Sequence, residues 1–507
     1  MLNARTVSEL LEGGDESAVA LAAPERESLN FGELRAHVMT TVAALNKLGI
    51  GRNDPVAIVL PNGPEMASAF LAIAGGATTA PLNPTYTADE FEFYLSDLNA
   101  KVLVLEAGSD SPARAAAEKL GLPVAELEWG AKDKSGLFQL HGEAVGDPPP
   151  NGGPAQADDV ALVLHTSGTT SRPKIVPLSH TNVCATAASV RDILALVPND
   201  HCLNIMPLFH IHGLVAAVLG SLGAGASVCC TPGFNAMKFF RWMKDAKPTW
   251  YTAVPTMHQA ILARAGGNRA IIESVPLRLI RSSSAALAPQ VMQNLEDTFA
   301  APVIESYGMT EAAHQMTSNP LPPRPRKPGS VGVAAGPEVS IMNDKGSLLP
   351  SGTVGEVVIR GVNVTAGYQS NPAANAEAFT DGWFRTGDQG VIDDEGYLRL
   401  TGRLKEIINR GGEKISPREV DEVLMDHPAV VQAVTFAIPH DKLGEDVAAA
   451  LVLGEGQTVD EREMRDFAGS RLAKFKVPRR VVFLDEIPKG PTGKLQRIGL
   501  AEKLGLT

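Results

Sequence analysis

The pattern of hydrophobic and polar positions predicts strands and helices that alternate over most of the chain. Short apolar runs rich in β-branched residues precede longer stretches in which apolar residues recur with helical spacing. This alternation favours βαβ units around a mostly parallel sheet, and so the α/β class. The expected strands span residues 56–60, 159–165, 226–230, 249–254, 277–284 and 303–307, and the expected helices span residues 64–74, 179–196 and 235–247 and follow Pro255 and Pro289.

The pattern changes after Gly402, where a more charged segment begins. Ser416 is the expected N-cap of the next helix, Pro417 takes its first position and Glu419 completes a capping box. The other expected elements are a hairpin at 405–415, strands at 430–438 and 447–453, and a helix at 460–472. Together they form a compact α+β unit large enough to be a domain. We therefore expect two domains, residues 1–402 and residues 403–507.

The segment from Cys202 to Met237 contains no Asp, Glu, Lys or Arg. A membrane span is one interpretation of such a stretch. However, it includes His210, His212, two prolines and several glycines, which favours a buried helix and strand in a large core. We therefore expect no integral membrane segment.

Composition and charge exclude several classes of protein. With 507 residues, of which 44% are hydrophobic and 20% charged, the chain can bury large cores and is not a disordered or disulfide-scaffold protein. Lys and Arg number 45 against 57 Asp and Glu, which gives a net charge of -12. Because no long basic block is present, nucleic acid is not an expected partner.

The cysteines and the chain ends indicate a cytoplasmic location. The N-terminal segment lacks the order of a secretory signal, and the last residues do not match a peroxisomal address. The four cysteines form no C-x-x-C pair and show no metal-like spacing with histidine, so we expect them to be reduced, buried thiols. They are Cys184, Cys202, Cys229 and Cys230.

A loop rich in hydroxyl groups is the first candidate for chemistry. The expected strand 159–165 runs into Thr166-Ser167-Gly168-Thr169-Thr170-Ser171-Arg172-Pro173-Lys174. Backbone N–H groups, hydroxyls and cations in such a loop can surround a polyphosphate, although the Gly-Lys-[Ser/Thr] ending of a Walker A loop is missing. An ordinary surface turn is the other interpretation of this composition.

Five further segments, in order along the chain, extend the pattern. This set resembles the adenylate-forming superfamily, which includes acyl-CoA synthetases, adenylation domains of peptide synthetases and beetle luciferases. The resemblance implies a large N-terminal body with mixed sheets and flanking helices, followed by a small, mobile α+β C-terminal domain. The segments are Tyr307-Gly308-Met309-Thr310-Glu311, Gly355 to Gly361, Gly382 to Asp388, Gly402 to Ile408 and Pro488 to Lys494.

The resemblance also implies the reaction and its cofactors. ATP, an acid and CoA would give acyl-CoA, AMP and diphosphate through an acyl-adenylate, with Mg²⁺ offsetting the triphosphate charge. Thr310 would bind the α-phosphate and Glu311 would hold Mg²⁺, an ion that prefers one or two carboxylates together with phosphate oxygens. Asp388 would accept the ribose hydroxyls beside Arg403. Further implied nucleotide contacts are Thr166, Ser167, Gly168, Thr169, Thr170, Lys174, Ser284, Ala285, Ala286, Glu305, Ser306, Tyr307, Gly308 and, less directly, Lys414.

Two lysines carry the remaining roles that the resemblance implies. Lys494 would lie between the acid and the α-phosphate and neutralise charge as it develops. Lys405 would be the hinge about which the small domain swings, so that one pocket serves two half-reactions. Taken singly, each lysine is also typical of a solvated surface position, as Glu311 is of a helix start and Asp388 of a turn.

The residues expected around the acid favour a small and polar substrate. His210, Ser283, Ser284 and His314 fall where the family builds its acyl pocket, and Arg281 is near them in sequence. Such a pocket penalises a fatty chain and suits a short acid with a second polar group. The string from His165 to Lys174 and a histidine at the position of His314 resemble oxalate–CoA ligases. We therefore predict oxalate, with His210, Ser284 and His314 at its distal carboxylate.

Several alternatives stay open at this stage. His210 is also typical of a pocket wall, and His314 of a buried structural histidine. The acid could instead be 4-coumarate-like or of medium chain length. A catalytically silent ATP-binding protein would not need both triphosphate and carboxylate chemistry, and a carrier-protein partner is not expected because no carrier-like segment follows Lys494.

Overall fold

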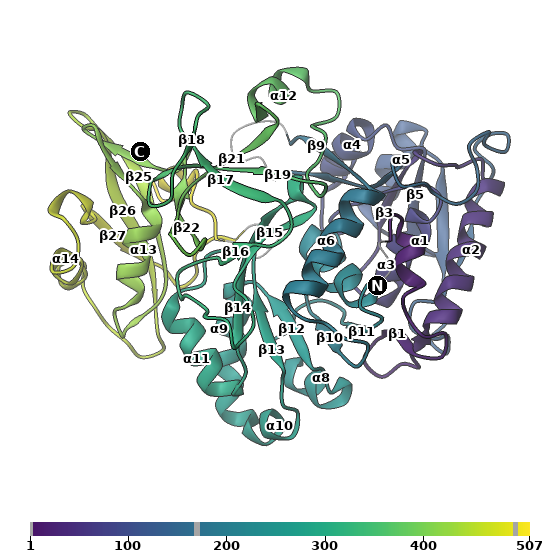
Figure 1. Cartoon of the computed structure of the whole chain (residues 1–507), viewed down its shortest axis with the longest axis horizontal. Coiled ribbons are helices and arrows are strands. Elements are labelled where there is room, and N and C mark those ends of the chain that lie inside the picture. Colours follow the sequence, from purple (N-terminus) through teal and green to yellow (C-terminus); the bar gives the residue numbers. More distant parts are fainter. Residues whose placement is uncertain (1–3, 167–172, 490–494, 507) are drawn as a thin grey trace.

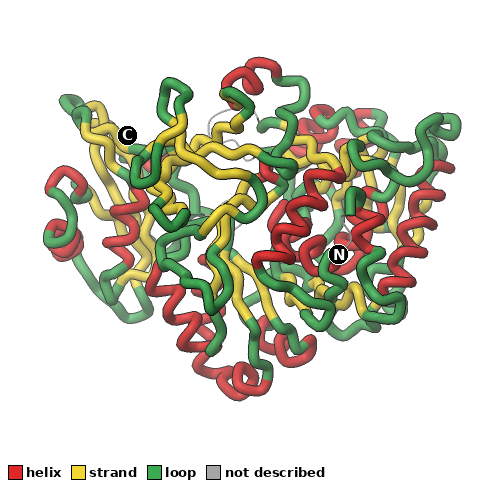
Figure 2. The backbone as a smooth tube through the Cα atoms, viewed as in Figure 1, coloured by secondary structure: helices red, strands yellow, loops and turns green. Residues whose placement is uncertain are grey.

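The computed structural model describes residues 4–166, 173–489 and 495–506. Within these residues the strands form four sheets, three built before residue 404 and one after it (Figure 1). Helices gather around the strands nearest the N-terminus, whereas the part of the molecule toward the C-terminus is richer in strands (Figure 2). This mixed α/β architecture confirms the predicted fold class.

The first sheet is parallel except at its two edges. Its strand order is β7-β6-β5-β3-β4-β8-β9, and only the outer pairs β6/β7 and β8/β9 are antiparallel. The parallel core confirms the expected βαβ units. Its strands are β3 (Pro55–Val59), β4 (Thr78–Pro81), β5 (Val102–Glu106), β6 (Val124–Glu128), β7 (Gln139–His141), β8 (Val160–His165) and β9 (Ile175–Ser179).

The second sheet changes direction beside the segment that contains Thr310 and Glu311. Its order is β16-β15-β14-β13-β12-β10-β11-β1-β2, parallel from β1 to β14 and antiparallel from β14 to β16. Its strands are β1 (Val19–Ala22), β2 (Leu29–Asn30), β10 (His201–Asn204), β11 (Ser227–Cys230), β12 (Trp250–Ala253), β13 (Leu279–Ser282), β14 (Val303–Met309), β15 (His314–Ser318) and β16 (Val333–Ala334).

Helices cover these two sheets and also lie between them. Every residue of α3 is buried, because this helix contacts β4 of the first sheet and β11 of the second. A helix enclosed on all sides needs no polar face, which explains why Glu65 and Ser68 are its only polar residues. The helices of this part are α1 (Val7–Leu11), α2 (Phe31–Lys47), α3 (Pro64–Ala74), α4 (Ala88–Asp97), α5 (Pro112–Leu120), α6 (His180–Ile193), α7 (Gly220–Leu222), α8 (Phe239–Ala246), α9 (Pro255–Ala265), α10 (Arg269–Ser274) and α11 (Pro289–Phe299).

Most of the uncharged segment from Cys202 to Met237 is buried in the body, as expected, although Met237 at its end is exposed. It supplies β10 and β11 and, between them, a π-helix at His212–Leu219 in which every residue is buried. The π-helix was not expected from the sequence. Among the described residues, no helix combines the length and the apolar character that crossing a membrane requires. The four cysteines are buried free thiols, which confirms that prediction.

A third sheet and a fourth sheet complete the molecule. The third has the order β18-β17-β19-β21-β20, with β22 paired to β21, and the fourth has the order β24-β23-β26-β25, with β27 paired to β26. Their strands are β17 (Glu338–Met342), β18 (Leu348–Leu349), β19 (Gly355–Arg360), β20 (Phe379–Thr380), β21 (Trp383–Ile392), β22 (Leu398–Arg403), β23 (Ile408–Arg410), β24 (Glu413–Ile415), β25 (Val430–His440), β26 (Gly444–Leu453) and β27 (Arg480–Phe483).

The C-terminal helices begin near the positions that the sequence predicts, with one correction. They are α13 (Pro417–Met425), α14 (Glu461–Gly469) and α15 (Leu500–Lys503). The helix α12 (Pro372–Ala378) precedes them and packs against β20 and β21 of the third sheet. Ser416 caps α13 by accepting from the Glu419 N–H. The expected capping box is incomplete because the Glu419 carboxylate pairs with Lys476 instead. The division into domains at residue 402 stays a prediction.

Candidate active site

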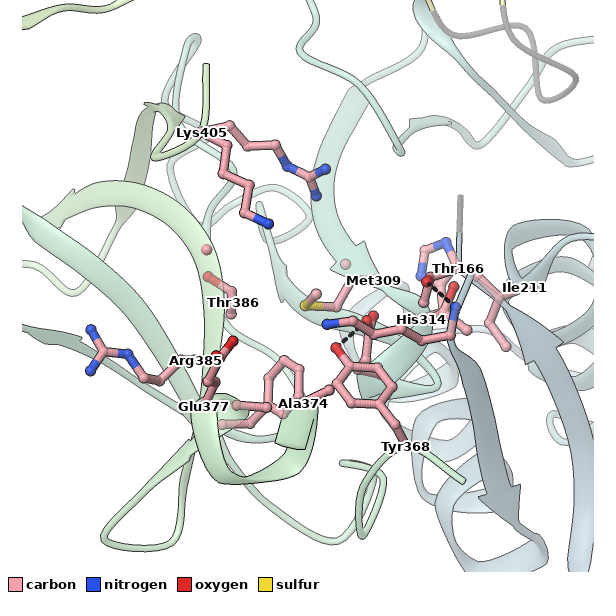
Figure 3. Close-up of a pocket in the computed structure, with 18 of the residues that line it drawn as sticks. Thr166, Ile211, Met309, His314, Tyr368, Ala374, Glu377, Arg385, Thr386 and Lys405 are labelled. Carbon is pink, nitrogen blue, oxygen red and sulfur yellow. Dashed lines mark hydrogen bonds between the residues drawn. The ribbon is translucent and has the colours of Figure 1, made fainter. Parts of the chain in front are cut away.

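A cavity of about 340 Å³ lies where the ends of β8, β13 and β14 meet the third sheet and the start of the C-terminal unit. Ligands of α/β proteins commonly bind at the carboxyl ends of parallel strands, where the loops converge. Figure 3 shows Lys405 entering the cavity from the side opposite Thr166, His314 and Tyr368. The lining residues are Thr166, Lys174, His210, Ile211, Ser284, Gly308, Met309, Thr310, Glu311, His314, Glu356, Tyr368, Ala374, Glu377, Ala378, Phe384, Arg385, Thr386, Gly387, Arg403, Lys405 and Ile498.

The two ends of the predicted phosphate loop are held together at the cavity wall. The Thr166 N–H donates to the Lys174 carbonyl at 2.9 Å, and the Lys174 N–H donates to the Thr166 hydroxyl at 3.2 Å. The Lys174 ammonium lies 4.4 Å from the centre of the Tyr368 ring. A cation is therefore placed at the loop base, and the intervening Ser167, Gly168, Thr169 and Thr170 lie outside the described residues.

Glu311 brings a buried carboxylate to the same cavity. Its side chain is held by Tyr368, whose hydroxyl donates to Oε1 at 2.9 Å. Burial raises the pKa of Glu311 above its ordinary value, while the Tyr368 hydrogen bond and the charges of Arg403 and Lys174 oppose that rise. A single carboxylate of this kind on the cavity wall fits a Mg²⁺ ion that takes its remaining ligands from phosphate and water.

Asp388 and Arg403 form an ion pair between neighbouring strands at the cavity edge. They are register partners on β21 and β22, and the Arg403 Nε donates to Asp388 Oδ1 at 2.9 Å. The Tyr307 hydroxyl donates to the other carboxylate oxygen at 2.5 Å. The charge of Asp388 raises the pKa of Arg403, so the guanidinium stays charged. Arg403 lines the cavity, whereas Asp388 stands directly behind it.

The far end of the cavity is formed by His210, Ser284 and His314. Their expected contact with the acid stays a prediction. Ser284 has a φ of 73° and His314 a φ of 106°, both in the left-handed region that side chains rarely adopt. Backbone strain of this kind persists where the surrounding fold imposes it, commonly at functional sites. The close approach of β15 explains Gly308, because a Cβ there would lie 1.5 Å from the His314 carbonyl oxygen.

Other predicted residues lie outside the cavity. The Ser283 hydroxyl donates to the Ser306 carbonyl within the core, and Glu305 accepts from the Leu287 N–H. Burial raises the pKa of Glu305 to about 7. Ala285 and Ala286 are exposed, Ser306 is buried away from the cavity, and Lys414 is exposed on β24. Lys494 lies outside the described residues.

The structure adds lining residues that the sequence reasoning did not select. Glu356, Thr386 and Gly387 belong to segments that were singled out as motifs, so their neighbourhood was indicated although their contact with the cavity was not. Tyr368 and the α12 residues Ala374 and Glu377 come from a stretch without any recognisable motif.

Comparisons with known proteins agree with this arrangement. Residues 12–369 match the model of the AMP-binding enzyme family, and residues 419–494 match that of the AMP-binding enzyme C-terminal domain. The chain belongs to the AMP-binding enzyme family. This confirms the predicted membership of the adenylate-forming superfamily.

Individual relatives of this AMP-binding enzyme match nearly its whole length. An oxalate–CoA ligase from Arabidopsis thaliana is 45% identical over 98% of each chain. An oxalate–CoA ligase from Saccharomyces cerevisiae is 42% identical over 89% of this chain and 87% of its own. A crystal structure of ATP-bound MatB from Rhodopseudomonas palustris has a TM-score of 0.88 and 29% identity, with 98% of both chains covered.

Proposed function

We propose that this AMP-binding enzyme is an ATP-dependent acid–CoA ligase whose acid is oxalate, and that it forms oxalyl-CoA, AMP and diphosphate. The observation that carries the choice of acid is the polar far end of the cavity, where His210, Ser284 and His314 converge. The two oxalate–CoA ligases that are 45% and 42% identical to this chain support the same choice.

The chemistry proceeds in two displacements. A carboxylate is a poor electrophile because its leaving group would be an oxide. In the first step a carboxylate oxygen attacks the α-phosphorus of ATP and the bond to diphosphate breaks. In the second step the CoA thiol loses its proton and attacks the acyl carbon, and AMP leaves. The protein needs no covalent nucleophile for either step, so its task is to position and to stabilise charge.

The charged groups of the cavity suit the nucleotide. We propose that Lys174 and Thr310 hold phosphate oxygens and that Asp388 and Arg403 hold the ribose. Glu311 is the residue that would hold Mg²⁺, which neutralises triphosphate charge when it is bound. Lys494 is proposed to reach the reacting oxygen in the first step, and Lys405 to be the hinge between the steps. The ATP-bound MatB structure supports ATP as the nucleotide.

The partners and location follow from the same proposal. The acid, ATP and CoA are small molecules, and neither nucleic acid nor a carrier protein is expected. The four buried free thiols support the cytoplasmic location that the sequence suggests.

The test is AMP release with CoA and ATP, comparing oxalate, malonate, 4-coumarate and octanoate. Oxalate is expected to exceed every other acid at least about tenfold in kcat/KM, because that margin needs only about 1.4 kcal/mol of differential transition-state binding. A preference for 4-coumarate or octanoate would overturn the choice of oxalate and leave the ligase reaction itself standing. No CoA-dependent AMP release with any acid would overturn the reaction as well.

A further inference from the structure

A fully buried arginine lies directly behind the far end of the cavity, which is called the acid end below because the acid is proposed to bind there. Arg281 is on β13, in the middle of the second sheet, and is 0% exposed. Its hydrogen bonds within the described residues go to the neutral side chains of His212, Thr252 and Gln315, and no ion pair is formed there. Because a guanidinium can only donate hydrogen bonds, each neutral group beside this buried cation must present an acceptor to it.

The arginine determines which nitrogen of His212 carries the proton. Arg281 Nη1 lies 3.2 Å from His212 Nε2, so this nitrogen must accept. The Thr252 hydroxyl, 2.6 Å from the same nitrogen, then donates to it as well. A neutral imidazole with an accepting Nε2 carries its proton on Nδ1. The opposite tautomer would place the donors of Arg281 and His212 face to face.

The proton on Nδ1 in turn orients Ser284. His212 Nδ1 is 3.1 Å from the Ser284 hydroxyl oxygen, and Ser284 lines the cavity. Because Nδ1 donates, the Ser284 oxygen accepts from it. The single proton of the serine hydroxyl is therefore left to donate to another acceptor, and the strongest acceptor that the cavity can receive at this point is an anion.

The same arginine also supports the strand that carries His314. Arg281 Nη2 donates to Gln315 Oε1 at 3.2 Å, and Gln315 Nε2 donates to the Ala335 carbonyl at 3.1 Å. Gln315 follows His314 on β15, and the rings of His314 and His212 are 5.0 Å apart. One buried guanidinium thus contacts the neighbours of both Ser284 and His314.

We propose that His212 is a positioning residue, which transmits the fixed donors of Arg281 to Ser284 so that the serine hydroxyl donates to the distal carboxylate of the acid. This inference rests on the proposed function, because it assumes a short acid with a second anionic group. It adds a reason why that group is recognised as a hydrogen-bond acceptor rather than as a polar group in general.

A double-mutant cycle tests the proposal in the full-length enzyme. The variants are His212→Leu, Ser284→Ala and the double variant, with KM and kcat for oxalate as readouts. Each single variant is expected to raise KM for oxalate about tenfold or more, which is the scale of one lost hydrogen bond to a charged group. The double variant is expected to be no worse than Ser284→Ala by more than about twofold, because His212 acts through Ser284. Effects that multiply would overturn the proposal.

A conservative variant and a matched control separate positioning from packing. His212→Gln keeps an acceptor for Arg281 and a donor for Ser284, and is expected to retain KM within about threefold. His180 is also fully buried but accepts from the Val7 N–H away from the cavity, so His180→Leu is expected to leave KM for oxalate unchanged. An equal rise in KM for His212→Gln and His212→Leu would contradict the proposal.

A spectroscopic measurement covers the case in which His212→Leu fails to fold. Nitrogen-15 NMR of histidine-labelled enzyme, with the signal assigned by His212→Gln, is expected to show a neutral ring protonated at Nδ1. A ring protonated at Nε2 would overturn the proposal whatever the substrate. A wild-type enzyme with this tautomer and no turnover of oxalate would instead overturn the proposed function.

Discussion

Tyr368 contacts two charged groups of the cavity at once. Its hydroxyl donates to Glu311, and its ring lies under the ammonium of Lys174. The hydrogen bond stabilises a carboxylate whose pKa is already raised by burial. A residue in this place controls whether Glu311 is ionised and correctly oriented when the nucleotide arrives.

Tyr368→Phe isolates the hydroxyl, because the ring that faces Lys174 is kept. We expect KM for ATP to rise about tenfold, since a hydrogen bond to a charged group contributes roughly 1.5–3 kcal/mol. The KM for the acid should change much less. Tyr397→Phe is the matched control, because the Tyr397 hydroxyl donates to the Pro325 carbonyl outside the cavity. The measurement is the initial rate at varied ATP concentrations. A change in KM for the acid alone would contradict the role of Tyr368 in ATP binding.

At this scale the sequence predicts residues inside contiguous motifs and fails for those between them. Thr310 and Glu311 were found because they stand in one short string, and both line the cavity. Tyr368 reaches the site only through the path of the chain between β19 and α12. Ser283 was expected at the acid but points into the core, because alternate residues of an extended segment face opposite sides.

In the hairpin of β14 and β15, His314 can take its position only because Gly308, on the opposite strand, has no side chain. Gly308 pairs with Gln315 in the antiparallel register, and no Cβ fits between it and the His314 carbonyl. Because the obstacle is backbone, a side-chain rotation cannot relieve it. The two strands must move apart if any other residue is present.

Gly308→Ala is therefore expected to lower the free energy of unfolding by about 3 kcal/mol or more and to reduce kcat/KM for the acid at least tenfold. Gly266→Ala is the control, since a Cβ at Gly266 meets nothing within 4 Å. Denaturant unfolding and the standard AMP assay are sufficient measurements. A Gly308→Ala enzyme as stable and active as the control would show that the hairpin can open without loss.

The sequence predicts elements well where one local rule dominates. The helix at 64–74 was predicted with its observed bounds, because its apolar run is long and Pro64 marks its start. The capping box at Glu419 failed because Lys476, 57 residues away, competes for the carboxylate. The π-helix at His212–Leu219 has no local signal in a stretch that is apolar on every side.

At the scale of the whole molecule, a buried carboxylate of the body faces the C-terminal unit. Glu305 is on β14, and the charges that act on it come from Arg418 and Glu422 of α13. Arg418 itself donates to Glu422 at 2.8 Å, so its charge is shared. Burial therefore prevails and raises the pKa of Glu305 to about 7. No local pattern could predict this, because the two partners are more than a hundred residues apart.

This arrangement predicts a dependence of stability on pH. In the unfolded chain Glu305 loses its proton near the ordinary value of 4.5, whereas the folded protein keeps it until about pH 7. Between these values the folded state binds more protons, so its free energy of unfolding falls as the pH rises, by up to about 3 kcal/mol, and levels off above pH 7. Glu305→Gln should remove this fall. The free energy of unfolding of Glu305→Gln, measured relative to that of wild type, should therefore be higher at pH 8 than at pH 5.

The comparison of the two pH profiles isolates Glu305 from all other titrating groups. Glu338→Gln serves as control, because Glu338 is exposed and Arg360 lowers its pKa, so that its small contribution has the opposite sign. Parallel profiles for wild type and Glu305→Gln would mean that the carboxylate is ionised in the folded protein and compensated by Arg418. In that case the contact between β14 and α13 would be an ion pair, and a swing of the C-terminal unit about Lys405 would have to break it.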